Sequence, residues 1–514
     1  MTVTSDRAPW RWRWVSVPDR KVAAVDLIER TEARRVAALG ALNAERQAAL
    51  GQFFTPARAA TLVASMPRLS TLEAPVRILD PGAGAGSLTA ALVARIAAER
   101  PGLGVHVVAV ETDPAVLPFL SETLADCCDL AGVTADLVEG DFLAGSTGLD
   151  ADPRMSGPFD LVIMNPPYGK LPASGHYRRA VATELVDCPN TYAAFWALGV
   201  AATAPGGQVV AIVPRSFANG TYFEGFRRWL LDRLALDTLH VFESRSTVFA
   251  DTGVLQENVI VSGTVGARPG RITLSASVGH ADDVTRKEVP ASAVVQPGDE
   301  HRFIRFSDGA AAVPASAQYT LGDLGLTVST GRVVDFRARE WLADAEEPGT
   351  VPLVYPGNVR DGGVVWPRII GKAQYFRAED EAARRLLLPA GVYPVIKRFS
   401  AKEERRRVVA GVWALPGTPA FENHLNYVHE KGHGLPDELA RGISAWLNST
   451  ALDDLFRTFS GHTQVNAGDL RTLPFPDREN LARLGRAVPG LMPSQSALDT
   501  LVSSVLAGVE AVAS

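Results

Sequence analysis

The sequence predicts an α/β fold, with a doubly wound, mostly parallel sheet followed by a C-terminal region of α+β character. The first indication is segment 76–97, where an apolar run ends at Asp80, a glycine-rich turn follows and a helical pattern begins. The second is that strand-like runs are followed by polar residues at Asp80, Glu111, Asp141 and Asn165, at intervals of 31, 30 and 24 residues. Those intervals fit successive strand–helix units of an open parallel sheet, which binds ligands at the carboxyl ends of its strands.

Residues 1–50 are expected to form an N-terminal arm and a helix. Trp and Arg alternate at 10–14, which is typical of a strand or arm with one buried face. The apolar spacing from Ala23 to Leu50 predicts an amphipathic helix that packs on the sheet domain.

The sheet domain is predicted to span residues 51–266. We expect its strands at the following apolar runs: Val76–Asp80, Val105–Val110, Leu137–Glu139, Phe159–Met164, Gln208–Val213, Leu236–Phe242 and Asn258–Val261. The last of them is expected to be antiparallel. Residues 267–320 are rich in Gly, Ala, Ser and Pro and contain short strand-like pieces, and we interpret them as a connecting and insertion segment.

The pattern changes at about residue 321. Short segments separated by Gly and Pro, with aromatic and basic residues between them, predict an α+β domain at 321–476. Residues 477–514 are expected to form a C-terminal helical tail.

The segment Asn165-Pro166-Pro167-Tyr168 carries the most specific chemistry, because it ends the strand-like run at 159–164. The asparagine oxygen and the Pro166 carbonyl can accept hydrogen bonds from an amino group on a flat ring. The prolines fix the turn, and the tyrosine offers a face for stacking. The alternative is an ordinary Pro-Pro turn with an aromatic plug. In this context the segment favours methyl transfer to a planar nitrogen.

The turn after Asp80 contains Gly82, Gly84 and Gly86 and leads into a helix. Such a turn brings the backbone close to a nucleoside cofactor and points the helix N-terminus at a polar group. Taken alone it is weak evidence, because glycines also allow a helix to pack tightly on a sheet.

The carboxylates on the other strands fit the same cofactor. Glu111 suits a ribose diol, and Asp141 can accept from an adenine amine while Phe142 stacks on the ring. Any one of these could be a solvated strand end. Their order along the chain, together with Asp80 and Asn165, favours a binding site.

These motifs resemble the gamma-class, TaqI-type S-adenosylmethionine-dependent DNA adenine-N6 methyltransferases, particularly modification enzymes of type II restriction-modification systems. The resemblance covers roughly residues 45–476 and has the gamma order, with segment 51–56 before the glycine turn and target recognition after the sheet. It implies a Rossmann-like methyltransferase sheet at 51–266 and a DNA-binding target-recognition domain at 321–476. Gly82-Ala83 stands where many relatives have Ala-Cys, so no cysteine chemistry is expected there.

The resemblance also implies further site residues. Phe53, Thr55 and Pro56 would meet the methionine end of the cofactor, and Asn165 would contribute to the cofactor site as well as to catalysis. Phe249 would be a second aromatic holding a flipped-out adenine together with Tyr168. For Phe249 the alternative is an ordinary core phenylalanine.

DNA contacts are expected in the C-terminal half. Arg405, Arg406 and Arg407 belong to a basic cluster that is either a phosphate-binding edge or a solvated face. Segment 460–466 resembles the end of a target-recognition domain, where Gln464 and Asn466 either read base edges or cap turns. The net charge of −6 argues mildly against a nucleic-acid partner, so the distribution of charge matters more than its sum.

The composition indicates a cytoplasmic enzyme. No apolar run reaches the roughly eighteen residues of a membrane span, and no secretory signal is evident. The three cysteines, at 127, 128 and 188, form no metal pattern, and no metal is required.

The sequence thus predicts methyl transfer from S-adenosylmethionine to N6 of adenine in double-stranded DNA, with a cognate restriction endonuclease as a separate protein. Transfer to N4 of cytosine uses the same geometry. The motifs are also compatible with methylation of rRNA or of a protein glutamine, and with a catalytically silent DNA-binding subunit.

Overall fold

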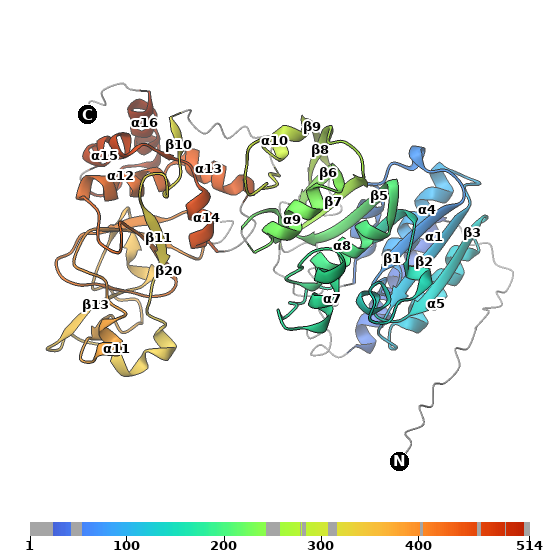
Figure 1. Ribbon diagram of the computed structural model, residues 1–514, viewed down its shortest axis with the longest axis horizontal. Coiled ribbons are helices and arrows are strands. Elements are labelled where there is room, and N and C mark those ends of the chain that lie inside the picture. Colours follow the sequence, from blue (N-terminus) through green and yellow to red (C-terminus); the bar gives the residue numbers. More distant parts are fainter. Residues whose placement is uncertain are drawn as a thin grey trace, which may run out of the picture. The chain divides into compact units, whose positions relative to one another are not determined.

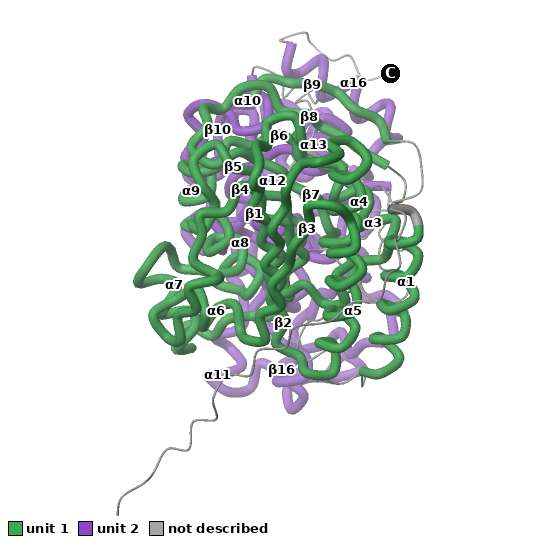
Figure 2. Tube along the Cα trace, turned by 90° about the vertical axis from the view of Figure 1, so that its right-hand side faces the viewer, with its two compact units in different colours: residues 1–214, 225–291 green, residues 215–224, 292–514 purple. Residues whose placement is uncertain are grey.

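The computed structural model describes residues 24–42, 54–220, 222–242, 257–277, 279, 284–306, 316–400, 405–459, 464–488 and 490–507. The chain divides into two compact units (Figure 2). Unit 1 comprises residues 1–214 and 225–291, and unit 2 comprises residues 215–224 and 292–514.

Unit 1 is built on a nine-stranded sheet of order β3-β2-β1-β4-β5-β7-β6-β8-β9 (Figure 1). The strands are β1 (Val76–Pro81), β2 (Val105–Glu111), β3 (Val133–Glu139), β4 (Phe159–Met164), β5 (Thr203–Pro214), β6 (Leu234–Phe242), β7 (Asn258–Val265), β8 (Arg271–Ser277) and β9 (Thr285–Pro290). The five strands that lie in the order β3-β2-β1-β4-β5 are parallel to their neighbours. Strand β7 is antiparallel to both β5 and β6. The predicted parallel sheet and the antiparallel strand at 258 are therefore confirmed.

Strands β8 and β9 correct the interpretation of residues 267–320 as a connecting segment. Strand β8 pairs in parallel with β6, and β9 pairs with β8, so the sheet continues to Pro290. All residues of β9 except Val289 are exposed. An exposed edge strand needs no apolar run, which explains why the hydrophobic pattern did not reveal it.

Helices cover both faces of this sheet. The helices are α1 (Ala24–Ala41), α3 (Ala57–Ala64), α4 (Ser87–Glu99), α5 (Leu117–Cys128), α6 (Phe142–Gly145), α7 (His176–Glu184), α8 (Thr191–Ala202) and α9 (Glu224–Leu231). In Figure 2, α4 and α5 lie on one side of β1 and β3, and α8 lies on the other. Helix α1 packs on α4 and α5 and is tied to α5 by an ion pair of 2.7 Å between Arg34 and Asp126. The N-terminal helix expected from the sequence therefore packs on the sheet domain.

The described residues of unit 2 form three further sheets, of six, four and two strands. The six-stranded sheet has the order β11-β20-β17-β18-β15-β14, the four-stranded sheet has the order β12-β16-β13-β19, and β10 pairs with β21. The strands are β10 (Ala317–Tyr319), β11 (Thr327–Thr330), β12 (Leu342–Ala343), β13 (Thr350–Val354), β14 (Val359–Arg360), β15 (Gly363–Val364), β16 (Tyr375–Arg377), β17 (Tyr393–Lys397), β18 (Ala410–Trp413), β19 (Ala420–Phe421), β20 (Leu425–His429) and β21 (Phe475–Pro476). The helices are α10 (Ala291–Val294), α11 (Glu381–Arg384), α12 (Asp437–Leu447), α13 (Thr450–Phe459), α14 (Ala467–Thr472), α15 (Arg478–Ala487) and α16 (Gln495–Leu506).

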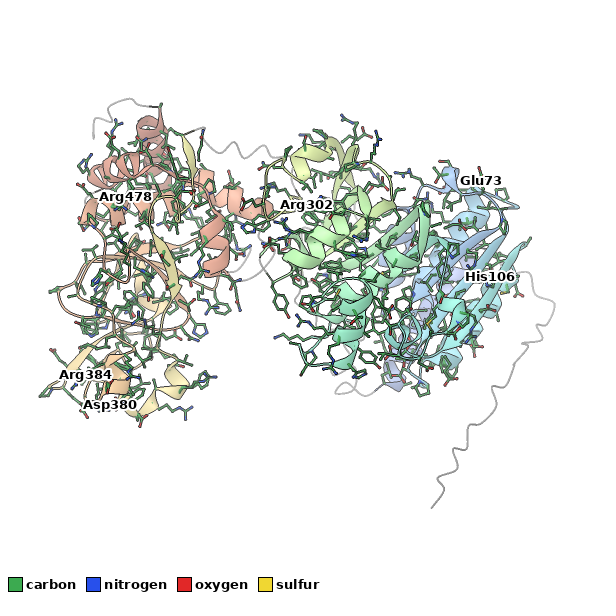
Figure 3. All side chains as sticks on the ribbon, viewed as in Figure 1. Glu73, His106, Arg302, Asp380, Arg384 and Arg478 are labelled. Carbon is green, nitrogen blue, oxygen red and sulfur yellow. The ribbon has the colours of Figure 1, made fainter. Side chains whose placement is uncertain are left out.

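Helices α15 and α16 are part of the unit 2 core rather than a separate tail. Their buried leucines and valines pack in one cluster with α12. A Cβ on Gly442 would lie 1.8 Å from the Leu481 oxygen, and one on Gly485 would lie 1.7 Å from the Glu438 oxygen, so α12 and α15 meet backbone to backbone. Arg478, labelled in Figure 3, adds a 2.9 Å hydrogen bond to a carboxylate oxygen of Glu430.

Candidate active site

The strand order reverses between β1 and β4, so the carboxyl ends of these strands form the ligand-binding edge of an open α/β sheet. The turn after β1 lies there. Gly82, Gly84 and Gly86 have φ of 74°, 58° and 86°, values that favour glycine. A Cβ on Gly84 would lie 2.8 Å from Cδ1 of Phe54, and one on Gly86 would lie 2.8 Å from Cγ2 of Thr123. These glycines therefore allow a close approach that no other residue would.

Glu111 is fixed against this turn at the end of β2. One carboxylate oxygen accepts from the Gly84 amide at 2.9 Å, and the other accepts from the amides of Thr112 at 2.9 Å and Asp113 at 2.8 Å. Burial raises the pKa of Glu111, and the three amides oppose this shift. The carboxylate is thus held in one orientation by backbone groups.

Asp80 is turned toward the interior. Its side chain is 1% exposed and accepts a 2.7 Å hydrogen bond from the Thr89 hydroxyl of α4. Burial raises the pKa of Asp80 to about 7. This hydrogen bond connects Asp80 of β1 to Thr89 of α4. The predicted contact of Asp80 with the cofactor stays a prediction.

Asp141 caps helix α6. Its Oδ1 accepts from the amides of Leu143 at 2.8 Å and Ala144 at 3.3 Å, and its Oδ2 accepts from the Tyr177 hydroxyl at 2.7 Å. Phe142 is buried, 2% exposed, with its ring centroid 5.0 Å from that of Phe195. Phe142 thus packs in the interior here, and its stacking on a cofactor ring stays a prediction.

The Asn165 side chain lies between two hydroxyl groups at the end of β4. Its Nδ2 donates to Oγ1 of Thr55 at 3.0 Å, and its Oδ1 accepts from the Tyr168 hydroxyl at 3.0 Å. In this arrangement the amide oxygen faces Tyr168 and the amide nitrogen faces Thr55. The predicted residues Thr55, Asn165 and Tyr168 are therefore brought together, although Thr55 is 110 residues away in the sequence.

The surroundings support this arrangement. The ring of Tyr192 on α8 meets that of Tyr168 edge-on at 6.3 Å, and desolvation raises the pKa of Tyr168 far above its ordinary value. Glu32 of α1 accepts from the Ala57 amide at 2.9 Å, which anchors the start of α3 just after Thr55 and Pro56. Pro166 is buried and Pro167 is half-buried. Phe53 and Phe249 lie outside the described residues.

Comparison with known proteins identifies the family. Residues 136–249 match the Eco57I restriction-modification methylase family. The type II methyltransferase M.BsuBI of Bacillus subtilis is 38% identical over 454 residues, covering 85% of this chain and 90% of the relative. The type II methyltransferase M.PstI of Providencia stuartii is 35% identical over 493 residues, covering 92% of this chain and 96% of the relative. The chain belongs to the type II methyltransferases.

A solved structure agrees with the fold of this methyltransferase. The type IIL restriction-modification enzyme MmeI, solved in complex with DNA, superposes with a TM-score of 0.57 at 12% identity over 95% of this chain and 74% of MmeI. The protein is a restriction-modification methyltransferase with a Rossmann-like sheet, and S-adenosylmethionine is its cofactor. The fixed carboxylates of Glu111, against the glycine turn, and of Asp141, at the end of β3, suit this cofactor, because a ribose diol and an adenine amine both donate hydrogen bonds.

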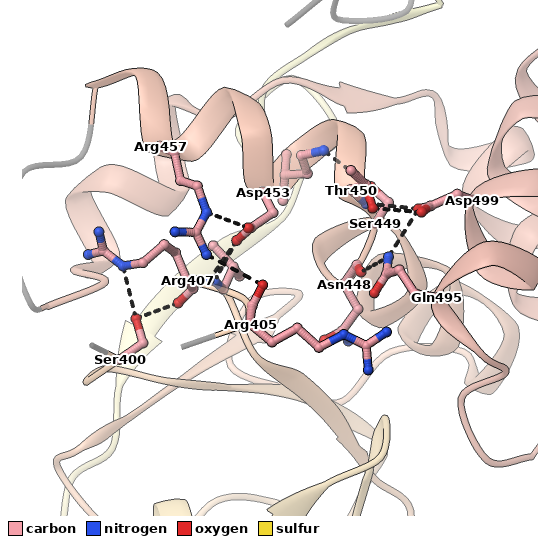
Figure 4. A network of polar contacts seen from close by, with 12 residues as sticks. Ser400, Arg405, Arg407, Asn448, Ser449, Thr450, Asp453, Arg457, Gln495 and Asp499 are labelled. Atoms are coloured by element: carbon pink, nitrogen blue, oxygen red, sulfur yellow. Dashed lines mark hydrogen bonds and ion pairs between the residues drawn. The ribbon is translucent and has the colours of Figure 1, made fainter. Parts of the chain in front are cut away.

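The predicted DNA-binding arginines of this methyltransferase occupy different environments in unit 2 (Figure 4). Arg405 is exposed, and Arg406 is half-buried with a 3.1 Å hydrogen bond to the Asn448 side chain. Arg407 is 1% exposed; its Nε contacts the Ser400 hydroxyl at 3.3 Å, and its amide donates to a carboxylate oxygen of Asp453 at 2.6 Å. Arg407 therefore does not belong to a surface cluster, since the chain folds its side chain inward while its two neighbours stay nearer the surface.

The two predicted base-reading residues also have local partners. Gln464 is half-buried, and its backbone forms an isolated antiparallel β-bridge with Phe399. Asn466 begins α14 in a capping box with Asp469, in which the Asn466 amide donates to the Asp469 carboxylate at 3.0 Å. Asn466 therefore does cap a helix, and base reading by either residue stays a prediction.

Tyr177 and Tyr192 are site contacts that the sequence motifs did not reveal. Both follow the Asn-Pro-Pro-Tyr segment, on α7 and at the start of α8. Aromatic residues after such a segment are the signal that could have found them. Within the described ranges, no cluster of His, Cys, Asp or Glu gathers as a metal site, and no helix has the length and hydrophobicity to cross a bilayer.

Proposed function

We propose that this methyltransferase transfers the methyl group of S-adenosylmethionine to N6 of an adenine flipped out of double-stranded DNA. The observation that carries the proposal is the oriented amide of Asn165, held between Thr55 and Tyr168 at the ligand-binding edge of the sheet. An amide oxygen has two lone pairs, so it can accept from a substrate amine as well as from the Tyr168 hydroxyl.

The chemistry follows from what these residues can accept. The Asn165 oxygen and the Pro166 carbonyl would accept the two hydrogens of the adenine amine, which draws its lone pair out of conjugation with the ring. When bound, S-adenosylmethionine would supply an electrophilic methyl group on a sulfonium and leave as S-adenosylhomocysteine, and the methylated amine would release one proton. The protein contributes position and preorganised acceptors, which are large terms in enzymatic rate enhancement.

Tyr168 would also hold the flipped base. Base–aromatic stacking is worth roughly 1–3 kcal/mol, which offsets part of the cost of unstacking the adenine. Phe249, outside the described residues, is proposed as the second aromatic on the basis of the family resemblance.

Unit 2 is proposed to read the DNA sequence, through phosphate contacts of Arg405 and Arg406 and base contacts of Gln464 or Asn466. Support comes from M.BsuBI and M.PstI, which match over nearly the whole chain, unit 2 included. A restriction-modification role further suggests a separate cognate endonuclease for the same site.

The test is expression in a methylation-deficient host, followed by single-molecule sequencing of the host DNA. We expect N6-methyladenine at one short fixed motif, and no modification with the Asn165→Ala variant. N4-methylcytosine at a fixed motif would replace adenine by cytosine as the target. Unmodified DNA together with methylated rRNA or release factor would overturn the proposal.

A further inference from the structure

Helix α7 lies in an excursion of the chain that starts directly after Tyr168 and returns at α8. Its two ends are joined by backbone hydrogen bonds, from the Thr191 amide to the Gly169 oxygen at 2.8 Å and from the Leu171 amide to the Pro189 oxygen at 3.1 Å. An excursion closed at its base in this way holds α7 in a defined place on unit 1.

Helix α7 is docked on α6 and the turn after it at two points. At its start, the Tyr177 hydroxyl donates to Oδ2 of Asp141 at 2.7 Å. At its end, a carboxylate oxygen of Glu184 accepts from the Gly148 amide at 2.8 Å. The first contact touches the carboxylate that the cofactor site uses, and the second does not.

The hydrogen bonds of Asp141 leave room for one further donor on Oδ2. Two carboxylate oxygens offer about four acceptor positions. Among the described residues, the amides of Leu143 and Ala144 use Oδ1, and the Tyr177 hydroxyl uses one position on Oδ2. The position that remains on Oδ2 has its direction set by the phenol beside it.

We infer that Tyr177 is a positioning residue for cofactor recognition: its hydroxyl orients Asp141 so that the remaining lone pair of Oδ2 selects the 6-amino group of the cofactor adenine. The inference rests on the cofactor role proposed for Asp141 and does not depend on which DNA base is methylated. A tyrosine hydroxyl is a donor at neutral pH in any case, and the hydrogen bond to Asp141 raises the pKa of Tyr177 further, to about 12.

The experiment is calorimetric titration of the full chain with two probes. One is S-adenosylhomocysteine, and the other is its analogue with hydrogen in place of the 6-amino group. The measured quantity is the ratio of the two dissociation constants, which reports selectivity for the amine. It requires no turnover.

Tyr177→Phe should weaken S-adenosylhomocysteine binding by roughly 2- to 12-fold, the effect of one hydrogen bond, and change the binding of the analogue by less than about twofold. Selectivity for the amine should therefore fall. Glu184→Ala is the matched control, because it removes the second docking point of α7 without touching Asp141. It should leave the ratio unchanged.

Two outcomes would overturn the inference. An unchanged ratio in Tyr177→Phe would show that the hydroxyl has no part in selectivity, and an equal fall in Glu184→Ala would assign the effect to docking of α7. Asp141→Asn separates the two levels of the argument. If that variant loses selectivity while Tyr177→Phe keeps it, only the inference about Tyr177 fails; if both keep it, the cofactor role of Asp141 fails as well.

Discussion

Replacing Thr55 by valine tests whether the orientation of Asn165 controls methyl transfer. Valine has nearly the shape of threonine and lacks the hydroxyl. Thr55 is 4% exposed, and its Oγ1 accepts the Asn165 Nδ2 hydrogen bond at 3.0 Å. The substitution therefore removes one partner of the Asn165 amide without opening a cavity.

The size of the effect follows from that single contact. A hydrogen bond of this kind contributes about 0.5–1.5 kcal/mol net, and each 1.36 kcal/mol is a factor of ten in rate. If the amide must keep its oxygen toward the substrate amine, the single-turnover rate should fall by roughly 2- to 12-fold. Rotation of the amide would present an N–H where an acceptor is required, so the loss should appear mainly in the rate constant.

The assay is single-turnover methylation of a cognate duplex with saturating enzyme and cofactor, with the cofactor dissociation constant measured separately. Thr55→Ser keeps the hydroxyl and should retain a rate close to that of the unmodified chain. A Thr55→Val rate equal to that of Thr55→Ser would refute the orienting role. A loss confined to cofactor affinity would instead assign the Thr55 hydroxyl to the methionine end of the cofactor.

Three further outcomes are expected. Asn165→Ala should abolish methylation and leave cofactor affinity within a few-fold by calorimetry, because it removes an acceptor for the reacting amine; retention of a tenth of the turnover would contradict this. Burial raises the pKa of Asp80 from 3.8 to about 7, so the folded chain keeps a proton that the unfolded chain has lost, and stability falls as pH rises through that window. Between about pH 5 and pH 8, the melting temperature of Asp80→Asn should therefore fall by less than that of the unmodified chain. Equal falls would count against the raised pKa of Asp80. Neutralising Arg405 and Arg406 should weaken cognate and scrambled duplexes alike and flatten the salt dependence of binding, and an unchanged salt slope would make them ordinary surface residues.

The sheet and the positions of its polar ends could be predicted from the sequence for a specific reason. A parallel strand buried on both faces carries a nearly continuous apolar run toward its carboxyl end, so the polar residue that follows this run marks the carboxyl edge. Val162 is fully buried, for example, and Asn165 follows it at the edge. Strand β9 lacked this signal, because only one of its residues is buried.

The contacts within the site could not be predicted in the same way. Thr55 reaches Asn165 across 110 residues, and Tyr177 reaches Asp141 across 36, and no local pattern specifies either pairing. The arginine cluster shows the same limit: charge counting treats Arg405 and Arg407 alike. The fold exposes the first and buries the second beside Ser400 and Phe456.

The strand order explains why these separate residues can serve one reaction. Asp141 follows β3, Glu111 ends β2 and Asn165 follows β4, in a sheet that runs β3-β2-β1-β4. Neighbouring strands lie about 4.7–4.9 Å apart, so three spacings separate the outer two residues by roughly 14 Å along the edge. That span is comparable to an extended nucleoside carrying a sulfonium side chain. Backbone hydrogen bonds of the sheet therefore set the distance between the carboxylate proposed to bind the cofactor adenine and the amide proposed to act in catalysis. Thr55, which precedes α3, and Tyr177, on α7, lie outside the sheet strands and adjust orientation, which is why their substitutions should tune rate and selectivity without dismantling the site.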